Sequence, residues 1–242
     1  MISPANDNLF YAGTLCKVAH YKEALQYLSL YLDEDKPTTD LDFETINIIC
    51  KATVDPIRNS LRILMDSYAN EVDMVHALNA EMIQHFKEKT HSQLTEYCHF
   101  IINMITEKLL PKATTPKDKV FCQKMRGDYY RYLAEFASQK DLQSIITEAH
   151  KAYLEAVESS QYLLHSEPMK LGLLLNYAIF IFEHLKNTAE AAEMLRKARR
   201  EAEIDMGQLD QNAHNESLEI LQAMRTNLIV WFDDDTESEK TL

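Results

Sequence analysis

The sequence is poor in the two residues that most often interrupt helices and form tight turns. Its 242 residues include four glycines and six prolines, well below the average usage of about 7% and 5%. A β-sandwich or barrel needs turn residues about every 8–12 positions, and a dinucleotide-binding loop needs glycines where the backbone approaches the phosphate. The chain has too few residues of these kinds for either, so long helices are the expected structure.

Basic residues are outnumbered as well. The chain has 25 lysines and arginines against 38 acidic residues, a net charge of −13 and a pI near 5.1. A protein that binds duplex nucleic acid needs a basic face that releases counterions, and an anionic membrane surface attracts positive charge. We therefore expect neither nucleic acid nor membrane as a partner.

The four cysteines are scattered, and no two of them form a CxxC pair. Isolated thiols of this kind are typical of reduced, buried side chains in cytosolic or nuclear proteins. The first residues, MISPANDNLFYAG, have neither the basic nor the apolar segment of a signal peptide. The longest uncharged apolar run, residues 171–182, is too short to span a bilayer. The expectation is a soluble protein of the cytoplasm, with the nucleus as a second compartment.

Apolar side chains recur at helical spacing through most of the chain. The pattern predicts about nine helices: two short ones before residue 37, then 39–70, 75–110, 117–136, 141–161, 169–184, 188–205 and 211–231. Pro56 lies inside the third, where an interior proline kinks a helix, so we expect a bend there. Short connections predict a single all-α domain over residues 1–232. The acidic segment 233–242 has no apolar stripe and is predicted to be a disordered tail.

Sequence motifs for catalysis are lacking. There is no glycine-rich phosphate loop, no GxSxG and no HExxH. A di-iron bundle needs two ExxH motifs, whereas the chain has one, from Glu96 to His99, which a surface glutamate and a packed histidine explain more simply. We therefore expect no enzyme activity, no cofactor and no bound metal.

One helical segment stands apart, KVFCQKMRGDYYRYLAEFA at residues 119–137. On a helix its Asp128, Arg131, Tyr132 and Glu135 form a single polar stripe. This stripe is compatible with a salt-bridged helix surface. It is also compatible with a site in which an arginine fork and a tyrosine hydroxyl bind an oxyanion while neighbouring carboxylates hold the arginine in place.

The same segment resembles the signature of the 14-3-3 family, adaptor proteins that bind phosphoserine and phosphothreonine. The run GDYYRYLAE is long and specific, and LGLLLNYAIFIFE (171–183) and SLEILQAMRTNLIVW (217–231) are similar to the family's last helices. The resemblance covers everything before the acidic tail. It implies an all-α bundle of about nine antiparallel helices with a cup-shaped groove. It also implies a non-catalytic adaptor that regulates the conformation, localisation or partners of phosphorylated clients.

The resemblance assigns the phosphate site to Lys51, Arg58, Arg131 and Tyr132. Lys51 and Arg58 are two helical turns apart and share a face if the third helix is continuous. The groove residues that it implies are Lys124, Leu175, Asn176, Ile179, Glu183, Glu219, Ile220, Ala223, Asn227 and Trp231. Asn176 also has a physical reason to be functional, because an amide inside an apolar run is costly without a partner.

Two departures from the family pattern bear on this site. Residues 55–57 read Asp-Pro-Ile where the family has small, small and arginine, and a kink there would change how the two cations of the third helix converge. On the last helix, Glu219 and Ala223 replace two leucines of the groove wall. These replacements should weaken or alter peptide selectivity.

The resemblance further implies a homodimer or heterodimer. In the family, the first helices pack on the third and fourth helices of a partner. The matching positions are Leu15, Val18, Glu23, Phe86 and Lys89, and the glutamate and lysine among them keep a charge pair. His20 and Gln93 replace a family salt bridge, but an exposed salt bridge contributes only about 0–1 kcal/mol. A dimer of altered strength is therefore expected.

Regulation by phosphorylation is a further hypothesis. Ser60 matches a family position whose phosphorylation disrupts dimers. In the tail, a phosphorylated Thr236, Ser238 or Thr241 would fold back into the groove.

A different interpretation stays open. Stretches such as YKEALQYLSLYL and NTAEAAEMLRKAR resemble helix-hairpin repeats, although a tetratricopeptide array has a period of about 34 residues that the long helices at 39–70 and 75–110 break. The alternative function is a helical-repeat (tetratricopeptide-like) scaffold that binds unphosphorylated peptides. Phosphate dependence of binding separates the two functions.

Overall fold

The computed structural model describes residues 7–74 and 76–232, apart from the side chain of Asp40. Within these residues the regular secondary structure is entirely helical, with nine α-helices and five short π-helical or 3-10 segments. The predicted all-α fold is thereby confirmed. The tail 233–242, with Thr236, Ser238 and Thr241, lies outside the described residues.

The helices lie close to their predicted positions. They are α1 (Asn8–Lys17), α2 (Tyr21–Asp33), α3 (Asp40–Asp73), α4 (Ala77–Met104), α5 (Pro116–Phe136), α6 (Gln139–Ser159), α7 (Pro168–Phe180), α8 (Thr188–Asp205) and α9 (Gln211–Phe232). α3 ends at Asp73, three residues beyond its predicted end, and α6 ends at Ser159, two residues before its own. The ends of α4 and α7 also differ in the type of helix. α4 continues into a π-helical segment (Ile105–Leu109), and α7 into another (Ile181–Leu185). In a π-turn the backbone hydrogen bond joins residues five apart instead of four. The side chains after a π-turn therefore point in other directions than they would in a continued α-helix.

The described chain falls into two compact units. Unit 1 contains residues 7–113 and 132–142, and unit 2 contains residues 114–131 and 143–232. The boundaries lie inside α5 and α6, so the consecutive residues Arg131 and Tyr132 belong to different units. The predicted division into one domain over 1–232 and a tail stays a prediction.

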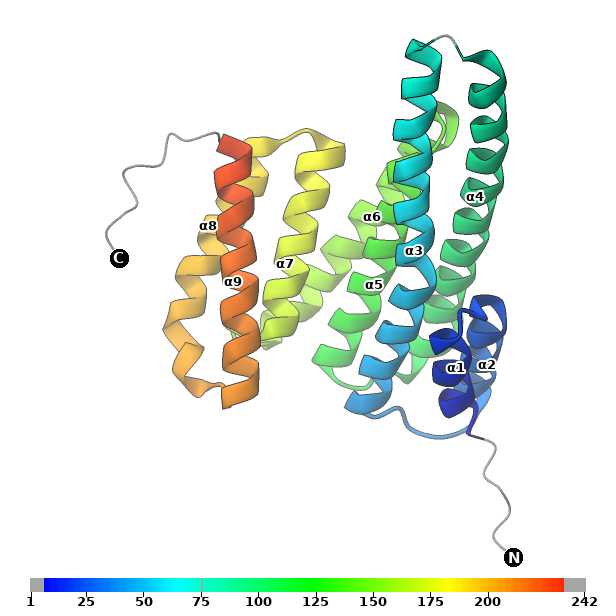
Figure 1. The fold of residues 1–242 in the computed structure, drawn as a ribbon. Helices are drawn as coiled ribbons and strands as arrows, with labels where there is room; N and C mark the ends of the chain where they lie inside the picture. The colour runs from blue at the N-terminus through cyan, green and yellow to red at the C-terminus, as the bar shows by residue number, and fades with distance from the viewer. Residues whose placement is uncertain (1–6, 75, 233–242) are drawn as a thin grey trace, which may run out of the picture. The chain divides into compact units, whose positions relative to one another are not determined.

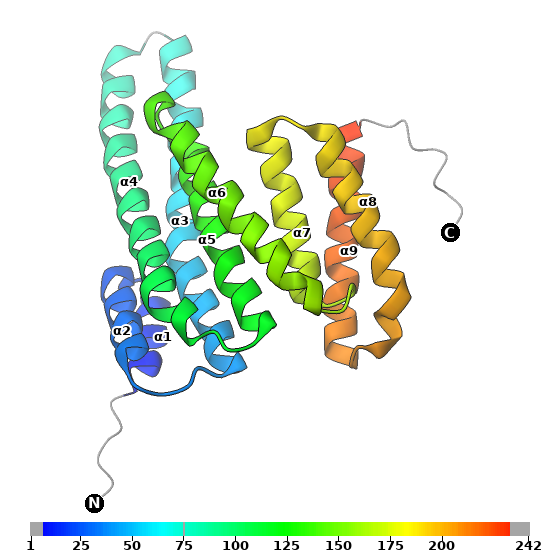
Figure 2. The same ribbon diagram turned by 180° about the vertical axis from the view of Figure 1, so that it is seen from behind.

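Unit 1 is built on the long helices α3 and α4, which lie side by side in both views (Figure 1, Figure 2). The α1–α2 pair packs beside the first half of α3. α2 buries the apolar stripe Ala24, Leu25, Leu28, Tyr31 and Leu32. α1 buries Asn8, Ala12 and Cys16, whereas Phe10 and Val18 are 64% and 61% exposed. α1 therefore has an apolar side that unit 1 does not cover.

α3 runs without interruption through Pro56. It begins at a capping box in which Thr39 and Asp42 satisfy each other's backbone N–H groups. The missing N–H of proline removes one helical hydrogen bond, and the burial of Val54 and Ile57 on either side holds the helix in place. The predicted bend stays a prediction.

In unit 2, α7, α8 and α9 pack on one another, with α8 antiparallel to both α7 and α9 (Figure 1, Figure 2). α8 turns a face of small residues inward, namely Ala191, Ala192, Ala198 and Ala202 around Leu195. Small side chains let neighbouring helices approach closely.

All four cysteines are unpaired and buried, as predicted. Burial raises the pKa of Cys98 and of Cys122 to about 12. These thiols are therefore protonated at neutral pH and pack as small apolar side chains.

Among residues 7–74 and 76–232, no helix combines the length and the apolar character needed to cross a membrane. The same residues contain no group of three or more His, Cys, Asp or Glu side chains placed to hold a metal ion. Of the isolated ExxH pair, His99 is exposed, and Glu96 forms an ion pair with Lys22 at 3.5 Å.

Candidate functional site

The polar stripe of α5 divides at the boundary between the units. Lys124, Asp128 and Arg131 belong to unit 2, whereas Tyr132 and Glu135 belong to unit 1. Each part of the stripe has partners within its own unit.

In unit 1 the side chain of Arg58 is only 11% exposed and is held on several sides. Its Nη2 and Nε donate to Oε2 of Glu135 at 2.8 and 3.2 Å. Its guanidinium carbon lies 3.6 Å from the centre of the Tyr132 ring, and its Nη1 lies 3.4 Å from Oδ1 of Asp55. A forked ion pair and a stacked ring fix the orientation of a guanidinium, so Arg58 is preorganised.

Glu135 positions two arginines, since Arg62 donates to its other oxygen. Burial by itself would raise the pKa of Glu135, but the hydrogen bonds from Arg62 and Arg58 outweigh burial and the pKa is lowered. Lys51 lies two turns before Arg58 on the continuous α3 and is exposed. Within the described residues, Lys51 forms no ion pair.

In unit 2 the side chain of Asp128 is 8% exposed, and its carboxylate accepts three hydrogen bonds. The hydroxyl of Tyr153 and the amide of Asn176 donate to Oδ1 at 2.7 and 2.8 Å, and Nζ of Lys124 donates to Oδ2 at 2.8 Å. Burial by itself would raise the pKa of Asp128, but the charges of Lys124 and Arg131 outweigh it and the pKa is lowered. Asp128 is therefore an ionised carboxylate that joins α5, α6 and α7.

Arg131 is connected to this carboxylate through Tyr153. Its side chain is 12% exposed, its Nε donates to the Tyr153 hydroxyl at 3.4 Å, and its Nη1 lies 3.8 Å from Oε2 of Glu183. Burial and the charge of Asp128 raise the pKa of Tyr153 well above its usual value. The hydroxyl thus keeps its proton, donates it to Asp128 and accepts from Arg131.

The amide of Asn176, which lies within an apolar stretch of sequence, has a hydrogen-bond partner in Asp128. Its Nδ2 binds Asp128, and within the described chain its Oδ1 has no hydrogen-bond partner. One end of the amide is therefore held in place, and the other end can accept a hydrogen bond.

Comparison with known proteins identifies the chain's family. The family model for 14-3-3 proteins matches residues 11–232. The chain belongs to the 14-3-3 family. A 14-3-3 protein of Giardia intestinalis is 32% identical over 230 residues, which are 94% of this chain and 93% of the relative. A 14-3-3 protein homolog of Neospora caninum is 32% identical over 207 residues, or 84% and 78%, and 14-3-3 protein 3 of Entamoeba histolytica is 28% identical over 240 residues, or 99% and 100%.

Membership of the 14-3-3 family confirms the resemblance carried by GDYYRYLAE and by the last helices. 14-3-3 proteins are non-catalytic adaptors that bind client proteins and form dimers, so membership supports an adaptor or scaffold role for this chain.

The remaining positions that the resemblance assigns to a peptide groove lie on α7, on the π-helical segment after it and on α9. The three apolar ones, Leu175, Ile179 and Ile220, are half-buried, as is Asn227. Glu183, Glu219 and Ala223 are exposed, and Trp231 stacks on Phe182 with ring centres 4.7 Å apart. The half-exposed apolar side chains are therefore not simply core residues.

Sequence reasoning missed two residues that pack in or against the hydrogen-bonded cluster around Asp128, namely Tyr153 and Gly127. A Cβ atom at position 127 would lie 2.8 Å from Cε1 and 2.9 Å from Cδ1 of Tyr153, closer than packed carbon atoms approach. Glycine inside a helix costs about 1 kcal/mol relative to alanine. A costly glycine is a sequence signal for close approach, and it was present in the run MRGDYY.

We predict that Gly127→Ala destabilises the protein. The added methyl group must displace the buried Tyr153 ring, and overpacking of this kind costs about 1–3 kcal/mol. Gly13→Ala in α1 is the control, because no atom lies within 4 Å of its Cβ position, and it should gain up to about 1 kcal/mol of helix stability. Urea unfolding of both variants measures the difference, and equal effects would contradict the packing argument.

The positions of the predicted dimer seam all lie in unit 1. Val18 and Phe86 are 61% and 50% exposed, Leu15 is half-buried, and Glu23 and Lys89 are exposed. Of the residues that replace a family salt bridge, His20 has its Nδ1 4.0 Å from Glu23, and Gln93 donates to the Tyr97 hydroxyl at 3.4 Å. The apolar side chains of Val18 and Phe86 and the charged side chains of Glu23 and Lys89 are thus exposed on the single chain, where a partner chain can contact them.

Proposed function

We propose that this 14-3-3 chain is a non-catalytic adaptor that binds phosphoserine and phosphothreonine motifs of client proteins and regulates their conformation, localisation or partners. The phosphate is bound by Lys51, Arg58, Arg131 and Tyr132. The family match supports the grouping of these four residues. The observation that carries the proposal is that Arg58 and Arg131 are both nearly buried and held in place. Arg58 is held by Glu135, and Arg131 by Tyr153 and Glu183.

Preorganised arginines suit a dianionic ligand. A phosphoserine carries a charge of about −1.5 to −2 at neutral pH and offers three acceptor oxygens. Arginine forks form charge-assisted hydrogen bonds with such a group, and little side-chain entropy is lost when the guanidinium is already oriented. The acidic remainder of the chain, with its net charge of −13, discourages non-specific binding of anions.

The peptide around the phosphoresidue is bound by α7 and α9. The amides of Asn176 and Asn227 hydrogen-bond its main chain, and Asn176 has an acceptor available for this purpose. Lys124, Glu183 and Trp231 make further polar contacts, while Leu175, Ile179 and Ile220 form the apolar wall. A client held in this way is kept in one conformation.

A fluorescence titration tests the proposal. A labelled phosphoserine peptide of the family's usual type is expected to bind with micromolar or tighter affinity, or about −8 kcal/mol, and its unphosphorylated twin is expected not to bind. Equal, weak binding of both peptides would overturn the proposal in favour of the helical-repeat scaffold.

Glu219→Leu is expected to strengthen the binding of such phosphopeptides. Glu219 is exposed on α9 one residue before Ile220, and a leucine there would restore the apolar wall of the family. Burial of one leucine side chain against a ligand contributes about 1.5–3 kcal/mol at most, so a several-fold gain is expected. Titration of the variant with the same peptide measures it, and an unchanged affinity would remove Glu219 from the groove.

We also propose that the chain forms a dimer through Leu15, Val18, Glu23, Phe86 and Lys89. Val18→Glu combined with Phe86→Glu is expected to shift the protein to monomer, because it places charges in an apolar seam without touching the core. Analytical ultracentrifugation measures the shift. Leu154→Glu is the control, since Leu154 is also 50% exposed but lies on α6, and this variant should remain dimeric.

Phosphorylation of Ser60 is a proposed means of regulating the dimer. Ser60 is exposed on α3 and its hydroxyl donates to the carbonyl of Pro56 at 2.8 Å, so a kinase can reach it. We propose that its phosphorylation weakens the dimer, as it does at the matching position of the family. We also propose a cytoplasmic location, with the nucleus as a second compartment, because proteins of this family are generally cytosolic.

A further inference from the structure

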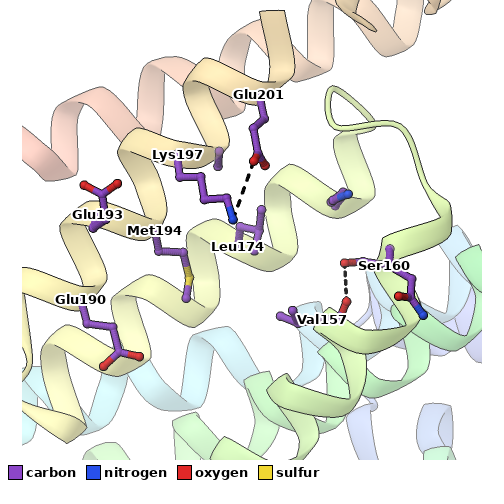
Figure 3. Close-up of a pocket in the computed structure, with 11 residues that line it drawn as sticks. Val157, Ser160, Leu174, Glu190, Glu193, Met194, Lys197 and Glu201 are labelled. Carbon is purple, nitrogen blue, oxygen red and sulfur yellow. Dashed lines mark hydrogen bonds and ion pairs between the residues drawn. The ribbon is translucent and has the colours of Figure 1, made fainter. Parts of the chain in front are cut away.

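Unit 2 contains a cavity of about 520 Å³ lined by the C-terminal end of α6, by α7 and by α8 (Figure 3). None of the proposed phosphate, groove or dimer residues lines it. Its apolar wall consists of Val157, Leu174, Met194 and Ala198. Small-molecule sites are typically apolar cavities of about 300–1,000 Å³ with a few polar groups, so the cavity has the size and the wall of such a site.

The carboxylates that line the cavity already have partners. The pairs are Glu190 with the amide of Asn187 (2.7 Å), Glu193 with Arg200 (3.0 Å) and Glu201 with Lys197 (3.7 Å). Figure 3 shows the last pair beside Leu174. Glu190 and Glu193 are exposed at the rim, where water and salt screen their charges.

Lys170 is the exception among the charged residues of the lining. Its Nζ donates to the carbonyl oxygen of Leu163 at 3.3 Å, and within the described chain it forms no ion pair with a carboxylate. Burial lowers the pKa of Lys170 despite the nearby charges of Glu201 and Asp205. An ammonium group has three donors, so Lys170 has two more for a ligand.

We infer that this cavity binds a small amphipathic monocarboxylate, whose carboxylate accepts from Nζ of Lys170 and whose alkyl chain packs against Leu174 and Met194. A half-buried ammonium without a carboxylate partner favours a carboxylate, and the apolar wall favours the chain. Three glutamates against two lysines in the lining disfavour a dianion such as phosphate. The site is therefore distinct in chemistry from the proposed phosphate site.

Decanoate labelled with ¹³C at its carboxyl group is the probe, titrated into the full chain and followed by NMR. Affinity is expected to rise about fourfold for each methylene from octanoate to decanoate. Decan-1-ol, which has the chain without the charge, should bind at least about tenfold more weakly. In protein labelled at its methionine methyl groups, the Met194 resonance, assigned with Met194→Leu, should shift on binding.

Variants of Lys170 decide the outcome. Lys170→Met keeps an apolar side chain and should lose about tenfold or more in decanoate affinity, while Lys170→Arg, which keeps the charge, should retain most of it. Lys151→Met on the exposed side of α6 is the control and should leave the affinity unchanged. The inference is overturned if Lys170→Met binds decanoate as tightly as the unmodified protein, if decan-1-ol binds as tightly as decanoate, or if the Met194 resonance does not move.

Discussion

Arg131→Ala is expected to weaken the binding of a phosphoserine peptide by about 100-fold. The substitution removes a guanidinium that Tyr153 and Glu183 hold in place. Removing one partner of a hydrogen-bonded, largely desolvated charge pair costs about 2–5 kcal/mol, and a 100-fold loss is about 2.8 kcal/mol. Titration of the protein and its variant with the phosphopeptide and its unphosphorylated twin measures the loss, which should be confined to the phosphopeptide.

Arg126→Ala is the matched control for this experiment. Arg126 lies on the same helix, is also 12% exposed and is paired with Glu155 at 3.2 Å. It has no part in the proposed phosphate site, so its removal should change the phosphopeptide affinity by no more than about threefold. Similar losses in both variants would mean that α5 needs its arginines for folding, and would contradict the role proposed for Arg131.

Asp128→Ala is expected to cause the largest loss of stability among single substitutions at this site. It would leave the buried hydroxyl of Tyr153, the amide of Asn176 and the ammonium of Lys124 without their common acceptor. Breaking a buried ion pair by removing one partner costs about 3–5 kcal/mol. At about 2–4 °C per kcal/mol for a protein of this size, the Tm should fall by roughly 6–20 °C, as measured by circular dichroism.

Asp33→Ala is the control that separates the effect of burial on stability from the effect of losing an ion pair. Asp33 pairs with Lys108 at 2.8 Å, the same distance that separates Asp128 from Lys124, but its side chain is 55% exposed against 8% for Asp128. An exposed pair contributes about 0–1 kcal/mol, so the Tm should fall by no more than about 4 °C. If Asp33→Ala costs as much as Asp128→Ala, the buried carboxylate is not the reason for the loss.

The helices were largely predictable from local periodicity. α8 and α9 begin at the predicted residues, and α2 buries all five residues of its apolar stripe. These features were predictable because the 3.6-residue spacing of apolar side chains can be read directly from the sequence. The ends of α4 and α7 were predicted less well. Whether a helix closes in an α-turn or a π-turn depends on packing around its last residues, and the hydrophobic repeat does not record it.

Some residues of the candidate site were predictable from the sequence, and others were identified only by the packing of the helices. The run GDYYRYLAE contains Arg131 and Tyr132, and its resemblance to the 14-3-3 signature predicts an anion site there. Tyr153 lies on α6 in a stretch with no motif, and its importance follows from its hydrogen bonds to Asp128 and Arg131. Gly127 could have indicated a close neighbour, but only the packing of α6 against α5 identifies that neighbour as Tyr153.

The sequence alone determined the helical class, the acidic charge, the burial of the thiols and the polar stripe of α5, because composition and i, i+3 and i+4 spacing are properties of the chain itself. Only the tertiary structure decided that Glu135 binds Arg58, 77 positions away, and that Asp128 joins three helices. It also decided that Lys170 lines a cavity and, among the residues that the structure describes, forms no ion pair with a carboxylate. The physical reason is that hydrogen bonds and ion pairs act over a few ångströms. Which residues come that close depends on how distant helices pack.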